Sequence, residues 1–283
     1  MTDAIAISKS ADTSDAAELP HKILKARRLR TTKQIVLGVG FPLFLLLLWE
    51  LAARIGLIDQ RFFPAPSRVA SGMVALLSDP DERARLLFDI GATYQRLALG
   101  YVIGSVLGIV TGVAMGLSIN ARFALGPLVN ATFPTPKLAI FPLLIVIFGL
   151  GDASKVALIA FGVFYMTCLS TLSGVLYSNP LHRDVAQAFR IPAWTRWSRI
   201  VVPAALPSIV TGLKLGLGQA LILVVSAEFV AADRGLGQFI WDSWQVLDVS
   251  RMFVGLVVVA LTGGAAVLLG EILERRLIPW STH

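Results

Sequence analysis

The sequence has few charged residues and almost no cysteine. Only 15% of its 283 residues are Asp, Glu, Lys or Arg, whereas soluble domains average about 25%. The single cysteine, Cys168, lies within an apolar run, so no disulfide can form within the chain. We expect it to pack as a small hydrophobic side chain. Apolar residues are in excess: they make up 55% of the chain, and the mean hydropathy is +0.73. These proportions predict a membrane protein.

Motifs for catalysis and nucleotide binding are missing as well. The sequence contains no GxxxxGK[ST] phosphate loop and no GxSxG, HExxH or CxxC motif. The segment GLGDASK, residues 149–155, is superficially similar to a phosphate loop but has the wrong spacing. The three histidines, His21, His182 and His283, are far apart, so we expect no metal site and no cofactor. The chain therefore has no visible means of hydrolysing ATP, and we do not expect an enzyme.

The formal net charge is +7, and the basic residues cluster beside apolar runs. That placement is typical of anchors on the cytoplasmic face of a membrane, and it disfavours nucleic-acid binding. Six lysines and arginines between residues 22 and 33 predict that this end stays in the cytoplasm. Residues 1–20 lack the apolar core of a signal peptide. We expect residues 1–30 to form a largely disordered cytoplasmic tail.

Six apolar runs are each long enough to cross a membrane, which takes about 20 residues. We expect spans over residues 34–55, 96–119, 124–150, 155–177, 207–230 and 252–271, within a transmembrane domain over 31–283. Pro134, Pro136 and Pro142 break the third run, and broken helices are tolerated where they are buried in protein or line a cavity. The sequence predicts an all-α polytopic membrane protein with six transmembrane helices and both termini in the cytoplasm.

The second predicted span carries a glycine at every fourth position, at residues 100, 104, 108, 112 and 116. Glycine within a helix costs about 1 kcal/mol relative to alanine. Five glycines at one spacing therefore indicate close contact with a neighbouring helix. We expect Gly104, Gly108 and Gly112 to make the closest backbone contacts of this span.

Ionisable residues at membrane depth are few: Lys137, Lys214 and Glu228. A charge near the membrane interior costs about 2.5–3.5 kcal/mol on insertion scales. On one interpretation, Lys137 reaches the interface or a backbone carbonyl exposed by its neighbouring prolines. On the other, Lys137 lines a translocation path and attracts an anion, and Lys214 either joins it or reaches the cytoplasmic headgroups. Both interpretations stay open at this point.

The connection over residues 178–206 has the pattern of two short helices. Asn179 and Pro180 form a helix start, and Pro192 predicts an elbow before a second amphipathic helix. The first helix places three apolar side chains on one face: Val185, Ala186 and Phe189. A short helix, an elbow and an amphipathic helix suit docking into a groove on a soluble partner.

The same connection resembles the EAA loop of permease subunits of bacterial ATP-binding-cassette importers. Asp184, Val185 and Ala186 match the Glu-Ala-Ala triplet of that loop. Arg190 stands where the loop has Gly, and Pro203 ends its aliphatic–Pro motif. The resemblance also includes the segments LWELAA, FPAPSRV, FPLLIVIFGLGDASK and AEFVAADRGLG, in that order. It is closest to the branch of nitrate, sulfonate, taurine and bicarbonate permeases.

The resemblance implies a MetI-like type I importer permease in a bacterial inner membrane, forming the path for a small anionic solute. It implies four partners: ATPase subunits, a periplasmic binding protein, a second permease copy and the lipid membrane. The residues it places at the ATPase are Asp184, Val185, Ala186, Phe189, Arg190 and Pro203. A membrane-embedded enzyme and a passive channel subunit are the alternatives. The first needs converging ionisable groups, and the docking loop disfavours the second. The particular solute stays open, because the binding protein largely sets specificity in such systems.

Overall fold

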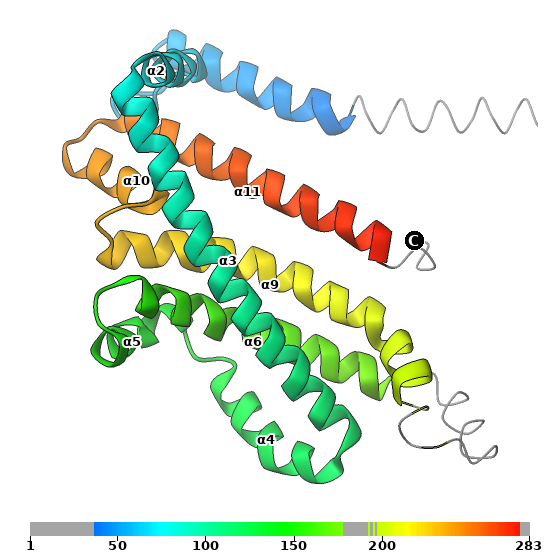
Figure 1. The fold of residues 1–283 in the computed structure, drawn as a ribbon. Helices are drawn as coiled ribbons and strands as arrows, with labels where there is room; N and C mark the ends of the chain where they lie inside the picture. Colours follow the sequence, from blue (N-terminus) through cyan, green and yellow to red (C-terminus); the bar gives the residue numbers. More distant parts are fainter. Residues whose placement is uncertain (1–36, 178–191, 193–194, 196, 278–283) are drawn as a thin grey trace, which may run out of the picture. The chain divides into compact units, whose positions relative to one another are not determined.

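The computed structural model describes residues 37–177, 192, 195 and 197–277, and all regular elements in these ranges are helices (Figure 1). Five helices are long and apolar enough to cross a membrane, and a bent pair makes a sixth if it counts as one span. The prediction of an all-α membrane protein is confirmed. The chain divides into two units, residues 1–68 and 69–283.

In the first unit, the helix Leu37–Arg54 is one of the candidate spans. Its last turns are held by Glu50, whose carboxylate accepts a hydrogen bond from Arg54 Nε at 2.6 Å. The same carboxylate accepts from the backbone N–H of Ser67 at 3.0 Å and from the Ser67 hydroxyl at 2.8 Å. Glu50 thus joins the end of the helix to the segment that follows it.

Helix α2, Pro66–Ser78, begins just before the boundary between the units. The elements that follow are α3 (Pro80–Leu117), α4 (Ile119–Thr132), the 3₁₀ helix η1 (Lys137–Ile140), α5 (Phe141–Phe148), α6 (Asp152–Leu176), the π-helix η2 (Trp197–Val201), α9 (Val202–Ala231), α10 (Leu236–Gln245) and α11 (Val249–Leu277).

Helix α3 is longer than the second predicted span, because it begins at Pro80 and includes the last part of the segment expected between the first two spans. Its start has strong local signals. Asp79 caps it by accepting hydrogen bonds from the N–H groups of Asp81 and Glu82. Pro80 occupies the first turn, where a missing N–H costs nothing, and the acidic Asp81 and Glu82 complement the helix dipole.

The third apolar run is broken, as its prolines predict. Helix α4 ends at Thr132, and the chain bends by 96° before η1 and α5. Pro134 and Pro136 lie in the break, whereas Pro142 lies in the first turn of α5, where no backbone hydrogen bond is lost.

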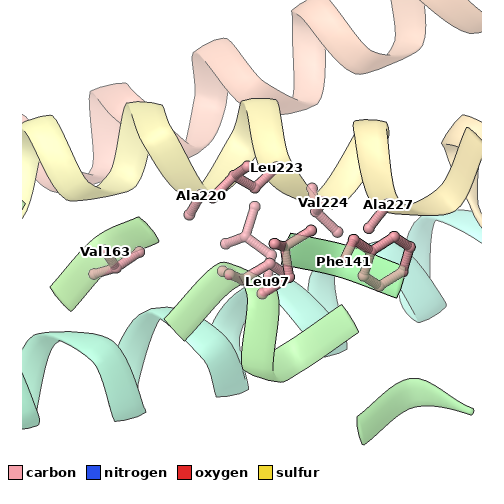
Figure 2. Close-up of a cluster of buried hydrophobic side chains, with 9 residues drawn as sticks. Leu97, Phe141, Val163, Ala220, Leu223, Val224 and Ala227 are labelled. Carbon is pink, nitrogen blue, oxygen red and sulfur yellow. The ribbon is translucent and has the colours of Figure 1, made fainter. Parts of the chain in front are cut away.

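Helix α6 packs against both α3 and α9 (Figure 1). It runs parallel to α3, since Gly100 faces Ile159 and Gly116 faces Val175. It runs antiparallel to α9, since Gly174 of α6 lies against Ser208, near the start of α9. A buried cluster joins these helices to α5, and Figure 2 shows its labelled members: Leu97, Phe141, Val163, Ala220, Leu223, Val224 and Ala227.

The five evenly spaced glycines of α3, at residues 100, 104, 108, 112 and 116, form the face that contacts α6. A Cβ atom added to Gly104 would lie 2.9 Å from Val163 Cβ, and one added to Gly112 would lie 2.8 Å from Thr171 Cβ. At Gly108 it would lie 2.7 Å from the carbonyl oxygen of Phe164. Real Cβ atoms essentially never lie within 3.0 Å of such neighbours. Only glycine therefore allows this approach of the two helices.

Candidate functional site

A fully buried ion pair lies at the end of the bundle where α6 begins and α9 ends. Nη1 of Arg96, on α3, lies 2.6 Å from Oε1 of Glu228, on α9, and their side chains are 2% and 0% exposed. Two charges lose so much hydration on burial that their attraction compensates only if further hydrogen bonds satisfy the remaining polar atoms. The hydrogen bonds from surrounding groups therefore decide whether this pair stabilises the bundle.

The Glu228 carboxylate is satisfied by groups from two elements. The Thr93 hydroxyl lies 2.9 Å from both carboxylate oxygens, and the backbone N–H of Gly237 donates to Oε2 at 2.9 Å. Thr93 in turn accepts from the backbone N–H of Leu236 at 2.9 Å. The start of α10 is thereby joined to α3 and α9 through one carboxylate.

The glycines before and within the first turn of α10 make room for that carboxylate. Gly235 has a φ of +122°, and a Cβ atom there would lie 2.5 Å from Glu228 Cδ. A Cβ atom on Gly237 would lie 2.6 Å from Glu228 Cβ. The RGLG segment is thus required both by backbone conformation and by the close approach of Glu228.

Two further charged residues near the buried pair, Asp152 and Arg234, are partly exposed to solvent. Asp152, in the first turn of α6, accepts from Arg96 Nε at 2.7 Å and from Arg234 Nη2 at 2.8 Å. Asp152 and Arg234 are each 41% exposed. Nη1 of Arg96 also donates to the carbonyl oxygen of Arg234 at 2.8 Å. Within the described residues, Nη2 of Arg96 is buried without a hydrogen-bond partner.

We call this set the charge network: Asp89, Thr93, Arg96, Asp152, Glu228 and Arg234. Asp89 belongs to it because its carboxylate accepts from the backbone N–H of Gly235 at 2.8 Å. The network joins α3, α6, α9 and the start of α10. Lys155 lies nearby and is buried, but its ammonium donates to the carbonyl oxygens of Leu150 and Gly151, at 3.0 and 3.1 Å.

Sequence reasoning missed the charge network as a unit. Asp152, Glu228 and Arg234 lie within segments of the family resemblance, whereas Asp89, Thr93 and Arg96 lie in none of them, and the sequence marks Glu228 only as an ionisable residue at membrane depth. One sequence signal for the pair was available. Arg96 begins one predicted span and Glu228 lies near the end of another, so the two opposite charges can lie at the same side of the membrane. Pairing them required knowing that α3 and α9 meet there.

Lys137 lies at the bend between α4 and α5, in an aromatic setting. Its ammonium donates to the carbonyl oxygen of Phe133 and lies 4.8 Å from the centroid of the Phe133 ring and 5.2 Å from that of Tyr165. The Tyr165 hydroxyl donates to Thr132 Oγ1 at 2.8 Å. In the described part of the chain, no carboxylate forms an ion pair with Lys137.

Lys214, unlike Lys137, forms an ion pair within the described residues and lies at the edge of a cavity. Its Nζ lies 2.5 Å from Oε2 of Glu274, on α11, at one edge of a cavity of about 350 Å³ between α9 and α11. Glu271 also lines that cavity. The two lysines therefore contact different helices and share no partner, and only Lys214 is neutralised by a carboxylate.

Most residues predicted to contact an ATPase lie outside the described residues: Asp184, Val185, Ala186, Phe189 and Arg190. Pro203 is described and lies in the first turn of α9, directly after η2. The connection that carries the others joins the end of α6 to η2. It is thus at the opposite end of α6 from the charge network.

Comparisons with known proteins identify the family. Residues 104–279 match the family described as "Binding-protein-dependent transport system inner membrane component". The chain is 32% identical to the taurine transport system permease protein TauC of Escherichia coli (strain K12), over 91% of this chain and 95% of that relative. The chain belongs to this family of inner-membrane transport components.

Other relatives have related names. The putative aliphatic sulfonates transport permease protein SsuC of Bacillus subtilis (strain 168) is 28% identical, over 86% of this chain and 87% of that relative. The nitrate import permease protein NrtB of Leptolyngbya laminosa is 26% identical, over 76% of this chain and 78% of that relative. These curated relatives are transporter permeases rather than enzymes.

A solved structure shares the fold. The crystal structure of an amino acid ABC transporter with histidines matches with a TM-score of 0.56 at 17% identity, covering 71% of this chain and 98% of that chain. The MetI-like permease fold predicted from the motifs is thereby confirmed.

Proposed function

We propose that this chain, together with a second copy, forms the path by which a small anionic solute enters the cell. A periplasmic binding protein delivers the solute, and separate ATPase subunits supply the energy. The observation that carries the proposal is the family match over residues 104–279, which includes the glycine face of α3, the broken span, α6, α9 and α11. The names of the relatives, which specify taurine, aliphatic sulfonates and nitrate, support an anionic solute.

The energy source is assigned to a partner because the sequence has no phosphate-binding loop. The connection over 178–206 is the proposed contact with that ATPase. The basic cluster at residues 22–33 supports placing this connection and both termini in the cytoplasm. The charge network then lies at the periplasmic end, because it is at the opposite end of α6.

The function is tested by reconstituting the permease with its ATPase and binding protein and measuring solute uptake. Ala186→Arg and Phe189→Asp are expected to leave the permease in the membrane but abolish most uptake, because each puts a charge on the apolar docking face. Arg61→Ala, at an exposed position outside the connection, serves as a control that transports normally. Normal ATPase co-purification and normal substrate-stimulated hydrolysis in both docking variants would reject the role of this connection.

The path residue that we propose is Lys137 rather than Lys214. The Glu274 carboxylate already neutralises Lys214, whereas among the described residues the Lys137 ammonium contacts a carbonyl oxygen and two aromatic rings and no carboxylate. A cation without a paired carboxylate attracts anions over a longer range than a neutralised pair does. Lys137 therefore supplies a positive charge to the path at the bend of the broken span.

Lys137→Met is expected to fold and assemble but to slow uptake of an anionic substrate several-fold, while Lys137→Arg keeps more activity because it keeps the charge. The second measurement is whether position 137 can be reached from water. A cysteine replacing Lys137, in a Cys168→Ala background, should react with small charged thiol reagents during the transport cycle. A cysteine at this position that stays unreactive throughout the cycle excludes Lys137 from the path.

A further inference from the structure

A second cavity, of about 400 Å³, lies beside the charge network, between the first turns of α3, the segment 232–235 and α10. We call it the outer cavity. Five carboxylates and three guanidinium groups line it, which gives the lining a formal charge of −2. Unlike the path proposed above, this surface therefore favours a cation and repels the proposed substrate.

Part of this lining is already paired. Arg251 lies 2.5 Å from Glu82, and Arg234 binds Asp152 outside the cavity. Asp233, Asp242 and Asp89 are three of the lining carboxylates that can accept further hydrogen bonds within the described part of the chain. Asp233 is exposed and makes no hydrogen bond or ion pair there, and Asp242 accepts only from Gln238 Nε2, at 2.6 Å.

Asp89, the third of these carboxylates, gives the strongest argument for a bound cation. Asp89 is only 6% exposed, yet it lines the outer cavity. One of its oxygens accepts from the backbone N–H of Gly235, and no described residue donates to the other. That second oxygen is not sealed inside the protein, so it is accessible from the cavity. The cavity therefore has a built acceptor on its wall that a donor from outside the chain can satisfy.

Two aromatic rings line the outer cavity, and each already has an arginine of this chain over it. The Arg234 guanidinium lies 5.6 Å from the centroid of the Phe88 ring, and that of Arg251 lies 5.0 Å from the centroid of the Phe239 ring. Both rings belong to residues that line the cavity. These cation–π contacts hold Arg234 and Arg251 at the cavity wall. The carboxylates are therefore the groups left to bind a further cation, and the volume exceeds what a bare metal ion requires.

We propose that the outer cavity receives a lysine or arginine side chain of the binding protein, whose charged end Asp89, Asp233 and Asp242 bind. This inference rests on the proposed function, because that function supplies both the partner and the periplasmic orientation of the cavity. A side chain of a docked protein fits better than a free solute, since the transported solute is an anion. The paired groups Glu82 and Arg251 then form the rim of the contact.

The position of the cavity also connects docking to the bundle. Arg234 and Asp89 line the cavity and belong to the charge network. A cation bound at Asp89 changes the field at Arg234, which shares Asp152 with Arg96. Docking therefore changes the electrostatic interactions of Asp152, in the first turn of α6, and of Glu228, at the end of α9.

The test uses the complete transporter in proteoliposomes and its cognate binding protein. The concentration of substrate-loaded binding protein that half-saturates ATP hydrolysis is measured for wild type and for the Asp233→Lys/Asp242→Lys variant. Because reversed charges at an interface repel a basic side chain, this concentration should rise by about tenfold or more. In wild type it should also rise with salt, and that dependence should flatten in the variant.

Asp81→Lys is the matched control, since Asp81 lies in the same first turns of α3 but does not line the cavity. It should behave as wild type. A photoreactive amino acid replacing Gln238, which lines the cavity, should cross-link to the binding protein. Wild-type half-saturation in the charge-reversed variant, at low ionic strength, overturns the inference. If the binding protein does not stimulate even the wild type, the proposed function itself fails.

Discussion

Arg96→Met is expected to destabilise the bundle by about 3–5 kcal/mol, because it leaves a buried carboxylate without its countercharge. Glu228 is fully buried, and among the described residues the Thr93 hydroxyl and the Gly237 N–H would then be the donors left to it. The single thiol of Cys168 is fully buried and provides a reporter. Its reaction with a thiol-activated dye during heating in detergent gives the melting temperature, which should fall strongly.

A double-mutant comparison separates lost charge from lost packing. Arg96→Met with Glu228→Met removes both charges, so the double variant should melt above Arg96→Met alone, although below wild type, since Thr93 and Gly237 lose an acceptor. Arg83→Met, on an exposed position of the same helix, should melt as wild type does. An Arg96→Met protein that melts with wild type would show that Glu228 is hydrated and that the pair does not hold the helices together.

Gly108→Leu is expected to prevent stable packing of α3 on α6. Overpacked sites commonly cost about 1–3 kcal/mol when side chains can move aside, but here a Cβ atom would meet the Thr167 hydroxyl and lie 2.7 Å from the backbone carbonyl of Phe164. The helix backbones must separate, so the cost should exceed that range. Cys168 on α6 should then react with thiol reagents at room temperature, and the permease should not co-purify with its ATPase.

Gly91→Leu is the matched control for this prediction. Gly91 lies on the same helix, but a Cβ atom there meets no atom within 4 Å. That variant should assemble, transport and protect Cys168 as wild type does. If Gly108→Leu also protects Cys168 and transports at the normal rate, the close approach of α3 and α6 is not required for assembly.

The features that sequence predicts here are those with a local or periodic cause. Apolar runs of sufficient length indicate the spanning helices, and prolines at 134 and 136 indicate the break, since proline removes a helical hydrogen bond. The four-residue spacing of glycines indicates one contact face of α3. None of these patterns specifies the 96° bend or identifies α6 as the partner of the glycine face, because both depend on neighbours distant in sequence.

The candidate site was harder to predict for the same reason. Arg96 and Glu228 come together only through the packing of α3, α6 and α9, and Asp152 joins them from a third helix. Lys214 was expected at the path or at the headgroups, and its partner Glu274 lies far along the chain on α11. Ion pairs between helices have no sequence period. They become visible only when the order and direction of the helices are known.

The length of α3 has a mechanical consequence. Its 38 residues span about 57 Å at 1.5 Å per residue, nearly twice the thickness of about 30 Å of a hydrocarbon core. One continuous helix thus carries Glu82 and Asp89, which line the outer cavity, near one end and the glycine face toward the other. Because α3 packs against α6 along that face, we expect a tilt imposed at the end of α3 that carries Glu82 and Asp89 to be transmitted to α6. The far end of α6 leads directly into the connection over 178–206.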